Sequence, residues 1–202
     1  MTNRKLTLAD IADMRAYERE REQFRQHVIE LKRRRRVGVG PHVTVVFENR
    51  DTIRFQIQEM ARIERLYSDA QIETELRVYN PLIPEPGNVS ATMFIELTSE
   101  ALLREWLPKL LGIERAVFVR IGDGAGAERV AFTADPEHEE QLTRTDLTAS
   151  VHYIHLSLSR EQIARFGSSP VTLGIDLADY RHEARLSDAT IAELLTDLRD
   201  DA

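Results

Sequence analysis

The sequence predicts an α+β or α/β fold, in which a mixed β-sheet of about six strands is flanked by helices and preceded by an N-terminal helical segment. A long run without proline or glycine at residues 8–36 predicts the helical segment. Two stretches, residues 94–122 and 153–177, each read strand, serine-capped helix, strand, and they predict two βαβ-like units in one sheet. We therefore expect residues 1–40 to pack as helix on a single α+β domain over residues 41–202.

The helical segment begins with Thr7 and Asp10, whose spacing resembles a capping box. Apolar residues then recur at helical spacing on one narrow face, and Gly38 is the expected stop. The KRRRR run at residues 32–36 lies in the last turns, where positive charge complements the helix dipole. A second copy of the chain could pair with this helix, so we expect a homodimer as one form of assembly.

The next segment predicts one strand and two helices. Residues 42–48 (HVTVVFE) alternate and are rich in valine, which is typical of a strand. Asn49 is a favourable N-cap for a helix over residues 51–66. A second helix over residues 69–79 should end before Pro81, because the residue that precedes a proline avoids helical geometry.

The rest of the chain alternates strands with short helices. Strands are expected over residues 92–97, 116–121, 128–133, 151–158 and 171–177. Helices are expected over residues 99–111 and 160–166 and from Ser187 to about Leu198. The GDGAGA stretch joins two strands and so predicts a hairpin connection, and the polar residues 134–149 predict an exposed loop.

Composition excludes several kinds of site and location. None of the 202 residues is cysteine, which rules out disulfides, a cysteine nucleophile and thiolate-bound zinc or iron–sulfur centres. No apolar run approaches the roughly 20 residues of a bilayer span, and the N-terminus lacks a secretory signal. We therefore expect a cytoplasmic protein that does not contact a membrane.

Charge is unevenly distributed along the chain. Residues 1–80 hold 16 Lys and Arg against 13 Asp and Glu, whereas residues 81–202 hold 11 against 21. Such an asymmetry could orient a partner, and ordinary solvation of the surface is the alternative. The sequence pI of about 5.5 argues against a dedicated nucleic-acid binder.

The helix over residues 51–66 carries the best candidates for a functional site. Its apolar stripe includes Ile53 and Ile57 and reaches Glu64 and Tyr67, so it predicts that the Glu64 carboxylate lies on the buried face and needs a cation. A structural ion pair to an arginine is the alternative interpretation. The candidates for ligand or partner binding are Glu48, Asn49, Gln56, Glu59, Arg62, Glu64 and Asn80.

Two further kinds of site can be considered. His27 and Glu30 share a helix face, and with Glu59 and Glu64 they could bind a metal if the two helices pack together, although the chain lacks the Glu-x-x-His pairs of helical diiron sites. The candidates for anion binding are Arg33, Arg34, Arg35 and Arg36, which precede a GVGP turn. Neither a P-loop, nor a dinucleotide fingerprint in its proper context, nor a serine elbow occurs. We predict no cofactor and keep a bound metal ion as an open alternative.

Several segments of the chain resemble a known family. The stretches KLTLADI, LKRRRRVGVGP, VVFENRDTIRFQIQEMARIE, YNPLIP, SATMFIEL and VHYIHL, in this order, are similar to an uncharacterised bacterial domain-of-unknown-function family, the 3501 family. FENRDT and QIQEMARIE are the most specific of them. The resemblance implies no catalytic residue. It does imply a genomic context of rubrerythrin-like diiron proteins and heterodisulfide-reductase-like iron–sulfur proteins.

The hypothesis that fits best is a non-catalytic accessory protein that binds such a redox partner. One alternative is a metal- or small-molecule-dependent enzyme with its carboxylates on the helix over residues 51–66. Another is a phosphate or nucleic-acid binder that uses the arginine run. Each alternative depends on what the side chains of these residues face in the folded protein.

Overall fold

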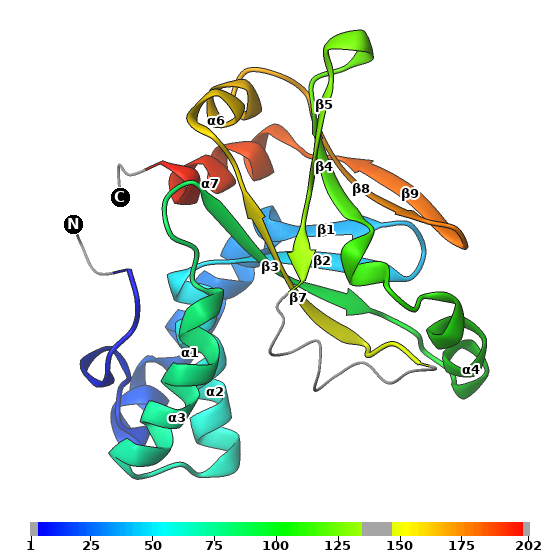
Figure 1. Ribbon diagram of the computed structural model, residues 1–202. Coiled ribbons are helices and arrows are strands. Elements are labelled where there is room, and N and C mark those ends of the chain that lie inside the picture. Colours follow the sequence, from blue (N-terminus) through cyan, green and yellow to red (C-terminus); the bar gives the residue numbers. More distant parts are fainter. Residues whose placement is uncertain (1–3, 135–146, 200–202) are drawn as a thin grey trace.

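The computed structural model describes residues 4–134 and 147–199, and it confirms the α+β class (Figure 1). Two antiparallel sheets pack together, and a lobe of helices extends from one of them (Figure 1). The described helices are α1 (Met14–Arg35), α2 (Arg50–Glu64), α3 (Asp69–Tyr79), α4 (Glu100–Lys109), α6 (Arg160–Phe166) and α7 (Asp188–Leu198). None of these helices is both long and apolar enough to cross a membrane.

One sheet of about six strands was expected, whereas the described chain forms two sheets. The five-stranded sheet has the order β1-β2-β3-β7-β6 and the four-stranded sheet the order β5-β4-β8-β9. Their strands are β1 (Arg36–Val39), β2 (Val43–Glu48), β3 (Asn88–Ile95), β4 (Val117–Ile121), β5 (Glu128–Ala131), β6 (Thr133–Ala134), β7 (Val151–Ser157), β8 (Val171–Leu177) and β9 (Tyr180–Arg185). Strands β1 and β9 were not predicted.

The two similar units do not both contribute to a single sheet, which corrects the βαβ interpretation. The units β3–α4–β4 and β7–α6–β8 each start in the five-stranded sheet and end in the four-stranded sheet. The first strands of the two units pair antiparallel with each other, and so do their last strands. Helix α4 has no fully buried residue, and it packs Trp106 and Leu107 against the main core.

The main core lies between the two sheets. Strand β2 alternates, so that Val43, Val45 and Phe47 belong to this core while the residues between them face the opposite side of the sheet. The sheets are also joined at their edges. The Tyr180 hydroxyl at the start of β9 donates to the carbonyl oxygen of Val39 at 2.8 Å.

The helical lobe, which comprises residues 4–35 and 50–83, has a core of its own. Its members, Leu6, Ile53, Ile57, Leu76, Leu82 and Ile83, come from the N-terminal segment, α2, α3 and the turn that follows. The Thr7–Asp10 capping box is present, but it closes a short 3₁₀ turn, and Asp13 caps α1 instead. Helix α1 ends at Arg35, before the expected stop at Gly38, and β1 begins at the next residue.

Other local predictions are confirmed. Asn49 caps α2, and α3 covers the predicted residues 69–79. Ser159 and Gln162 form the capping box of α6. β4 and β5 pair antiparallel around the GDGAGA stretch, as the predicted hairpin requires. The polar loop predicted at residues 134–149 lies mostly outside the described residues.

Candidate functional site

The outer face of the five-stranded sheet meets the helical lobe at a cavity of about 210 Å³, which we call the sheet–helix cavity. It is bounded by α1, α2 and α3 on one side and by β2, β3 and β7 on the other. Its polar lining residues are Lys32, Glu48, Thr52, Gln56, Tyr79, Thr92 and Tyr153. Two of these, Glu48 and Gln56, are among the candidates that the sequence suggested.

Glu48 supplies a buried carboxylate to this cavity. It is the last residue of β2 and only 6% exposed. Its carboxylate accepts hydrogen bonds from the Thr52 hydroxyl at 2.5 Å and the Thr92 hydroxyl at 2.6 Å. Among residues 4–134 and 147–199, no ion pair to Glu48 is formed. A buried carboxylate is costly without a cation, so hydroxyl donors alone leave part of this cost uncompensated.

The opposite charge in the cavity comes from α1. The side chain of Lys32 lines the cavity, and within the described part of the chain its amine forms no ion pair. Gln56 forms a side-chain hydrogen bond with Tyr79. Burial raises the pKa of Tyr79, the hydrogen bond with Gln56 lowers it, and the nearby Glu75 and Glu64 raise it, so the net shift is upward.

Glu59, another sequence candidate, joins α1 to α2. Its carboxylate accepts from the Tyr17 hydroxyl at 2.7 Å, from Arg21 at 2.7 Å and from Arg62 at 3.1 Å. The hydrogen bond from Arg21, together with those from Arg62 and Tyr17, outweighs burial and lowers the pKa of Glu59 to about 2. These contacts stabilise the helix pair, although the buried Nε of Arg62 has no hydrogen-bond partner among the described residues.

Asn49 and Asn80 have structural contacts. The Asn49 side chain accepts from the Thr52 amide and caps α2. The Asn80 side chain accepts from the Leu6 amide at 2.8 Å and donates to the Leu6 carbonyl oxygen at 2.9 Å. This pair of bonds fixes the N-terminal segment against the turn that follows α3.

The expectation that Glu64 lies on the buried face of its helix is wrong, because its side chain is exposed. Helix α2 ends at Glu64, Arg65 adopts the left-handed conformation, and the buried stripe stops one turn earlier at Ala61. Tyr67, expected to continue the stripe, is 73% exposed. The carboxylate of Glu64 lies near that of Glu75. Burial and the charge of Glu64 both raise the pKa of Glu75.

The four weak metal candidates are not brought together. His27 contacts Asp51 at 2.8 Å, and Glu30 pairs with Arg33 at 2.6 Å. Glu59 is bound by arginines and Glu64 is exposed. Within the part of the chain that the structure describes, no group of three or more His, Asp or Glu side chains is placed to hold a metal ion.

Each arginine of the basic run pairs with a carboxylate of the protein itself. Arg33 pairs with Glu30, Arg34 and Arg35 with Glu193, and Arg36 with Glu96. Arg35 is completely buried and also binds Asp197. The run therefore serves mainly to attach the end of α1 to α7 and to the sheet.

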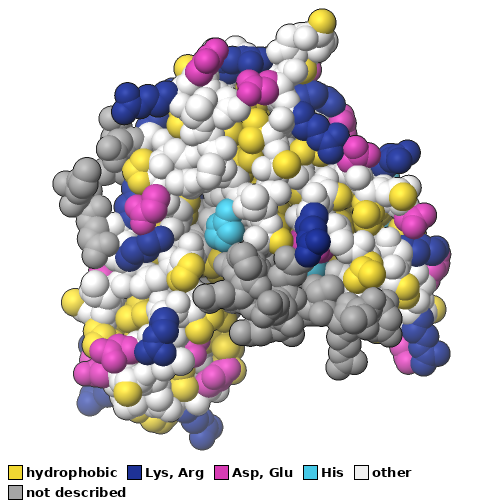
Figure 2. All heavy atoms as spheres, viewed as in Figure 1, with side chains coloured by type: hydrophobic (Ala, Val, Ile, Leu, Met, Phe, Trp, Pro, Cys, Tyr) yellow, Lys and Arg dark blue, Asp and Glu magenta, His cyan; other side chains and the backbone are white. Residues whose placement is uncertain are grey.

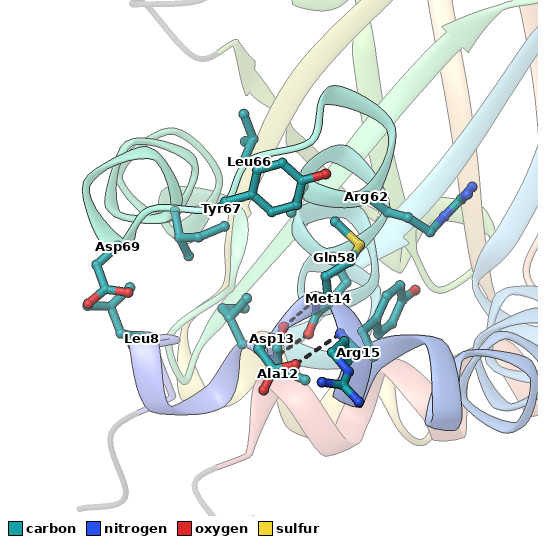
Figure 3. A pocket seen from close by; sticks show the side chains of 14 residues that line it. Leu8, Ala12, Asp13, Met14, Arg15, Gln58, Arg62, Leu66, Tyr67 and Asp69 are labelled. Carbon is teal, nitrogen blue, oxygen red and sulfur yellow. Dashed lines mark hydrogen bonds between the residues drawn. The ribbon is translucent and has the colours of Figure 1, made fainter.

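A second hollow lies at the far end of the helical lobe, and we call it the lobe groove (Figure 3). It has a volume of about 480 Å³ and runs between the start of α1 and the junction of α2 with α3. Tyr67 and Met14 both extend toward it in Figure 3, whereas the guanidinium of Arg62 points away. Gln58 closes its floor, since its amide accepts from the Ala12 backbone at 2.7 Å and donates to the Ala12 carbonyl oxygen.

Exposed apolar side chains gather on the same lobe. Among the residues that the structure describes, four large hydrophobic side chains are exposed, and three of them, Ile63, Tyr67 and Val78, belong to α2, α3 or their connection. The fourth, Leu111, follows α4. Figure 2 shows hydrophobic groups interspersed with both signs of charge over the lobe at the lower left.

The residues that sequence reasoning missed come from elements far apart in the chain. Thr92 and Tyr153 lie on β3 and β7, and only the antiparallel pairing of these strands brings them opposite one another. Lys32 was noted only as part of a basic run. The alternation of β3 (residues 88–95, NVSATMFI) could have shown that Ser90, Thr92 and Phe94 share a face.

Comparisons with known proteins show where the chain belongs but give no activity. The model of a family described as "Protein of unknown function (DUF3501)" matches residues 5–198. The chain is also similar to a crystal structure, at 1.90 Å resolution, of a novel protein of unknown function from Burkholderia pseudomallei K96243. The two share 35% identity with a TM-score of 0.87, over 96% of this chain and 100% of that one. No curated protein matches the chain.

Proposed function

The chain belongs to the DUF3501 family, whose function is unknown, and on this premise we propose that it is a non-catalytic accessory protein that binds another protein through its helical lobe. The observation that carries the proposal is that three of the four exposed large apolar side chains of the described residues belong to that lobe. Ile63 is 65% exposed and Tyr67 is 73% exposed; Tyr67 lines the lobe groove, and Ile63 follows Arg62, which also lines it. Apolar surface gathered in one place marks an interaction site more often than scattered apolar residues do.

The surroundings of these side chains suit a protein partner. A standard interface needs about 800 Å² from each partner, and aromatic residues at its centre with a charged rim are typical. Tyr67 lies at such a centre, and Arg15, Arg62 and Asp69 line the edge of the groove. The groove gives a partner side chain somewhere to insert, which is how the strongest contacts of an interface form.

The partner we propose is a redox protein, either a rubrerythrin-like diiron protein or a cysteine-rich iron–sulfur protein. Its support is the genomic context that the family resemblance implies. The chain has no cysteine, so in such a pair the partner would carry the sulfur ligands. Homodimerisation through the same lobe is the competing proposal, because a second copy would cover the same apolar groups.

Two other proposals from the sequence have less support. A carboxylate-centred enzyme on α2 would need Glu59 and Glu64 to face one site, yet the first binds arginines and the second is exposed. An anion site on the arginine run would compete with carboxylates that already pair with all four guanidinium groups, including Glu193.

Binding of purified, cofactor-loaded diiron and iron–sulfur candidates to the immobilised full chain tests the proposal. We expect Ile63→Gln and Tyr67→Gln each to weaken binding by about tenfold, because each removes apolar contact area. Leu111→Gln is the matched control, since Leu111 is also exposed but lies outside the lobe, and it should leave binding unchanged.

Binding that is absent with both intact partners would refute the redox proposal. Light scattering over a range of concentrations distinguishes the homodimer. If the wild-type chain dimerises and Tyr67→Gln makes it a monomer, the lobe is covered by a second copy instead. Equal loss of partner binding in Tyr67→Gln and Leu111→Gln would contradict the assignment to the lobe.

A further inference from the structure

We propose that the sheet–helix cavity binds a small zwitterion, which places its ammonium group on Glu48 and its carboxylate on Lys32. The site is independent of the lobe groove and of any protein partner. The sheet–helix cavity lies where the helical lobe meets the five-stranded sheet, and the groove lies on the other side of α2, against the start of α1.

Glu48 lines the cavity, and its carboxylate has unused capacity to accept hydrogen bonds. An ionised carboxylate offers about four acceptor positions, and the hydroxyls of Thr52 and Thr92 occupy one on each oxygen. These two hydroxyls come from α2 and from β3, so they hold the carboxylate in one orientation. An ammonium group would supply both the missing donors and the missing positive charge.

Lys32 would bind the carboxylate end of the same ligand. Its side chain lines the cavity from α1, and its amine is more than 4.0 Å from the Glu48 carboxylate, because no ion pair links the two. Two opposite charges that share a cavity without touching leave room for a molecule that carries the complementary pair. Arg35, one turn after Lys32, donates to the backbone carbonyl oxygen of Glu48 at 3.4 Å, but the carboxylates that it pairs with are those of Glu193 and Asp197.

The remaining walls set the size and polarity of the ligand. Ile53, Leu82, Phe94 and Val151 provide an apolar surface, and Tyr153 adds an aromatic ring. A volume of about 210 Å³ exceeds the about 150 Å³ of an engineered cavity that binds benzene. It is below the about 300 Å³ at which drug-sized pockets begin. The space therefore fits a small amino acid-like molecule with an apolar side chain.

Calorimetric titration of the full chain with three matched probes tests the inference. L-Leucine carries both charges, isoamylamine is the same molecule without the carboxylate, and 4-methylpentanoate is the same molecule without the amine. Leucine should bind at least about tenfold more tightly than either relative, because each lost charge removes a charge-assisted hydrogen bond.

Two variants assign each charge to its residue. In Glu48→Gln the advantage of leucine over 4-methylpentanoate should disappear, and in Lys32→Met the advantage of leucine over isoamylamine should disappear. Glu64→Gln and Lys109→Met are the matched controls, because they remove the same charges from side chains outside the cavity. Thermal denaturation of each variant confirms that it is folded before titration.

The comparison of probes on the wild-type chain stands even if a variant fails to fold. Equal affinity for all three probes would overturn the inference, and so would the absence of binding by all three at about 10 mM. An equal loss of leucine binding in Glu48→Gln and Glu64→Gln would also overturn it. None of these outcomes depends on whether a redox protein binds the lobe.

Discussion

The buried guanidinium of Arg35 donates to the carboxylate of Asp197 at 2.6 Å and thereby joins the end of α1 to the last turn of α7. The same guanidinium donates to Glu193 at 2.9 Å. Burial raises the pKa of Asp197 even though Arg35 opposes this shift. At Glu193 the effects of Arg34 and Arg35 outweigh burial, and the pKa is lowered. Arg35 is thus the shared cation of two carboxylates whose pKa values shift in opposite directions.

Replacing Arg35 should strongly destabilise the protein. Arg35→Met leaves Asp197 and Glu193 without their buried cation, which costs about 3–5 kcal/mol in comparable buried pairs. Urea denaturation followed by circular dichroism measures this loss. Arg33→Met is the control, because Arg33 and Glu30 are both exposed, and it should change the unfolding free energy by less than about 0.5 kcal/mol. Similar losses in the two variants would contradict the role assigned to Arg35.

The Glu59 cluster should make stability depend on acid pH. The pKa of Glu59 is lowered from its ordinary value of 4.5 to about 2. Its ionised form therefore stabilises the folded state above pH 4.5, and this contribution is lost as the pH falls toward 2. Glu59→Gln should cost about 2 kcal/mol at pH 7, after allowance for solvent screening.

Denaturation of both proteins at several pH values checks this expectation. The difference in unfolding free energy between wild type and Glu59→Gln should shrink steadily below pH 4.5. Glu64→Gln, which removes an exposed carboxylate from the same helix, should show no such trend. A difference that stays constant down to the acid limit would show that the charge of Glu59 is not what stabilises the helix pair.

Gly40 should tolerate no side chain. It has a φ of +75°, and an added Cβ would lie 2.5 Å from the His182 ring and 2.7 Å from the Tyr180 hydroxyl. Gly124 has a similar φ of +67° but open space around it. Gly124→Ala should therefore cost only the left-handed strain of about 1 kcal/mol, whereas Gly40→Ala should cost more by about 1–3 kcal/mol. Thermal denaturation of the two variants isolates the clash, and equal costs would show that it is relieved.

Asn80 should control the order of the N-terminal segment. Asn80→Ala removes both hydrogen bonds to the backbone of Leu6, at a cost of about 1–3 kcal/mol. Hydrogen exchange of the Leu6 amide should accelerate at least about tenfold relative to wild type. Exchange in the interior of β3 should change only by as much as the global stability falls. Unchanged protection of Leu6 would contradict the anchoring role of Asn80.

Local signals in the sequence predicted local structure well. Asn49, Ser159 and Pro81 act through atoms within a few residues, so the caps of α2 and α6 and the end of α3 follow directly from the chain. Strand β9 was missed because its sequence, YRHEAR, carries mostly polar residues. Its side chains alternate between more buried and exposed positions, but few of them are apolar. Strand β1 was missed because it begins inside the basic run that ends α1.

Long-range contacts decided the rest and left little local trace. Arg35 is buried only because Glu193 and Asp197 lie on one face of a helix about 160 residues later. The helical periodicity placed Glu64 on the same side of α2 as Ile53 and Ile57. It did not reveal that the neighbouring elements cover this side only as far as Ala61. The Glu48 carboxylate was noted as a candidate, and its donor Thr92 became apparent only when β3 was placed beside β2.

Helix α1 passes into β1 with no residue between them. At 1.5 Å per residue its 22 residues form a rod of about 33 Å, which runs from the groove end of the lobe to the edge of the five-stranded sheet (Figure 1). Because no loop separates rod from strand, the chain has no hinge at this junction. A force on α1 near Tyr17 would be transmitted along the helix, past the buried Arg35, to the hydrogen bonds between β1 and β2.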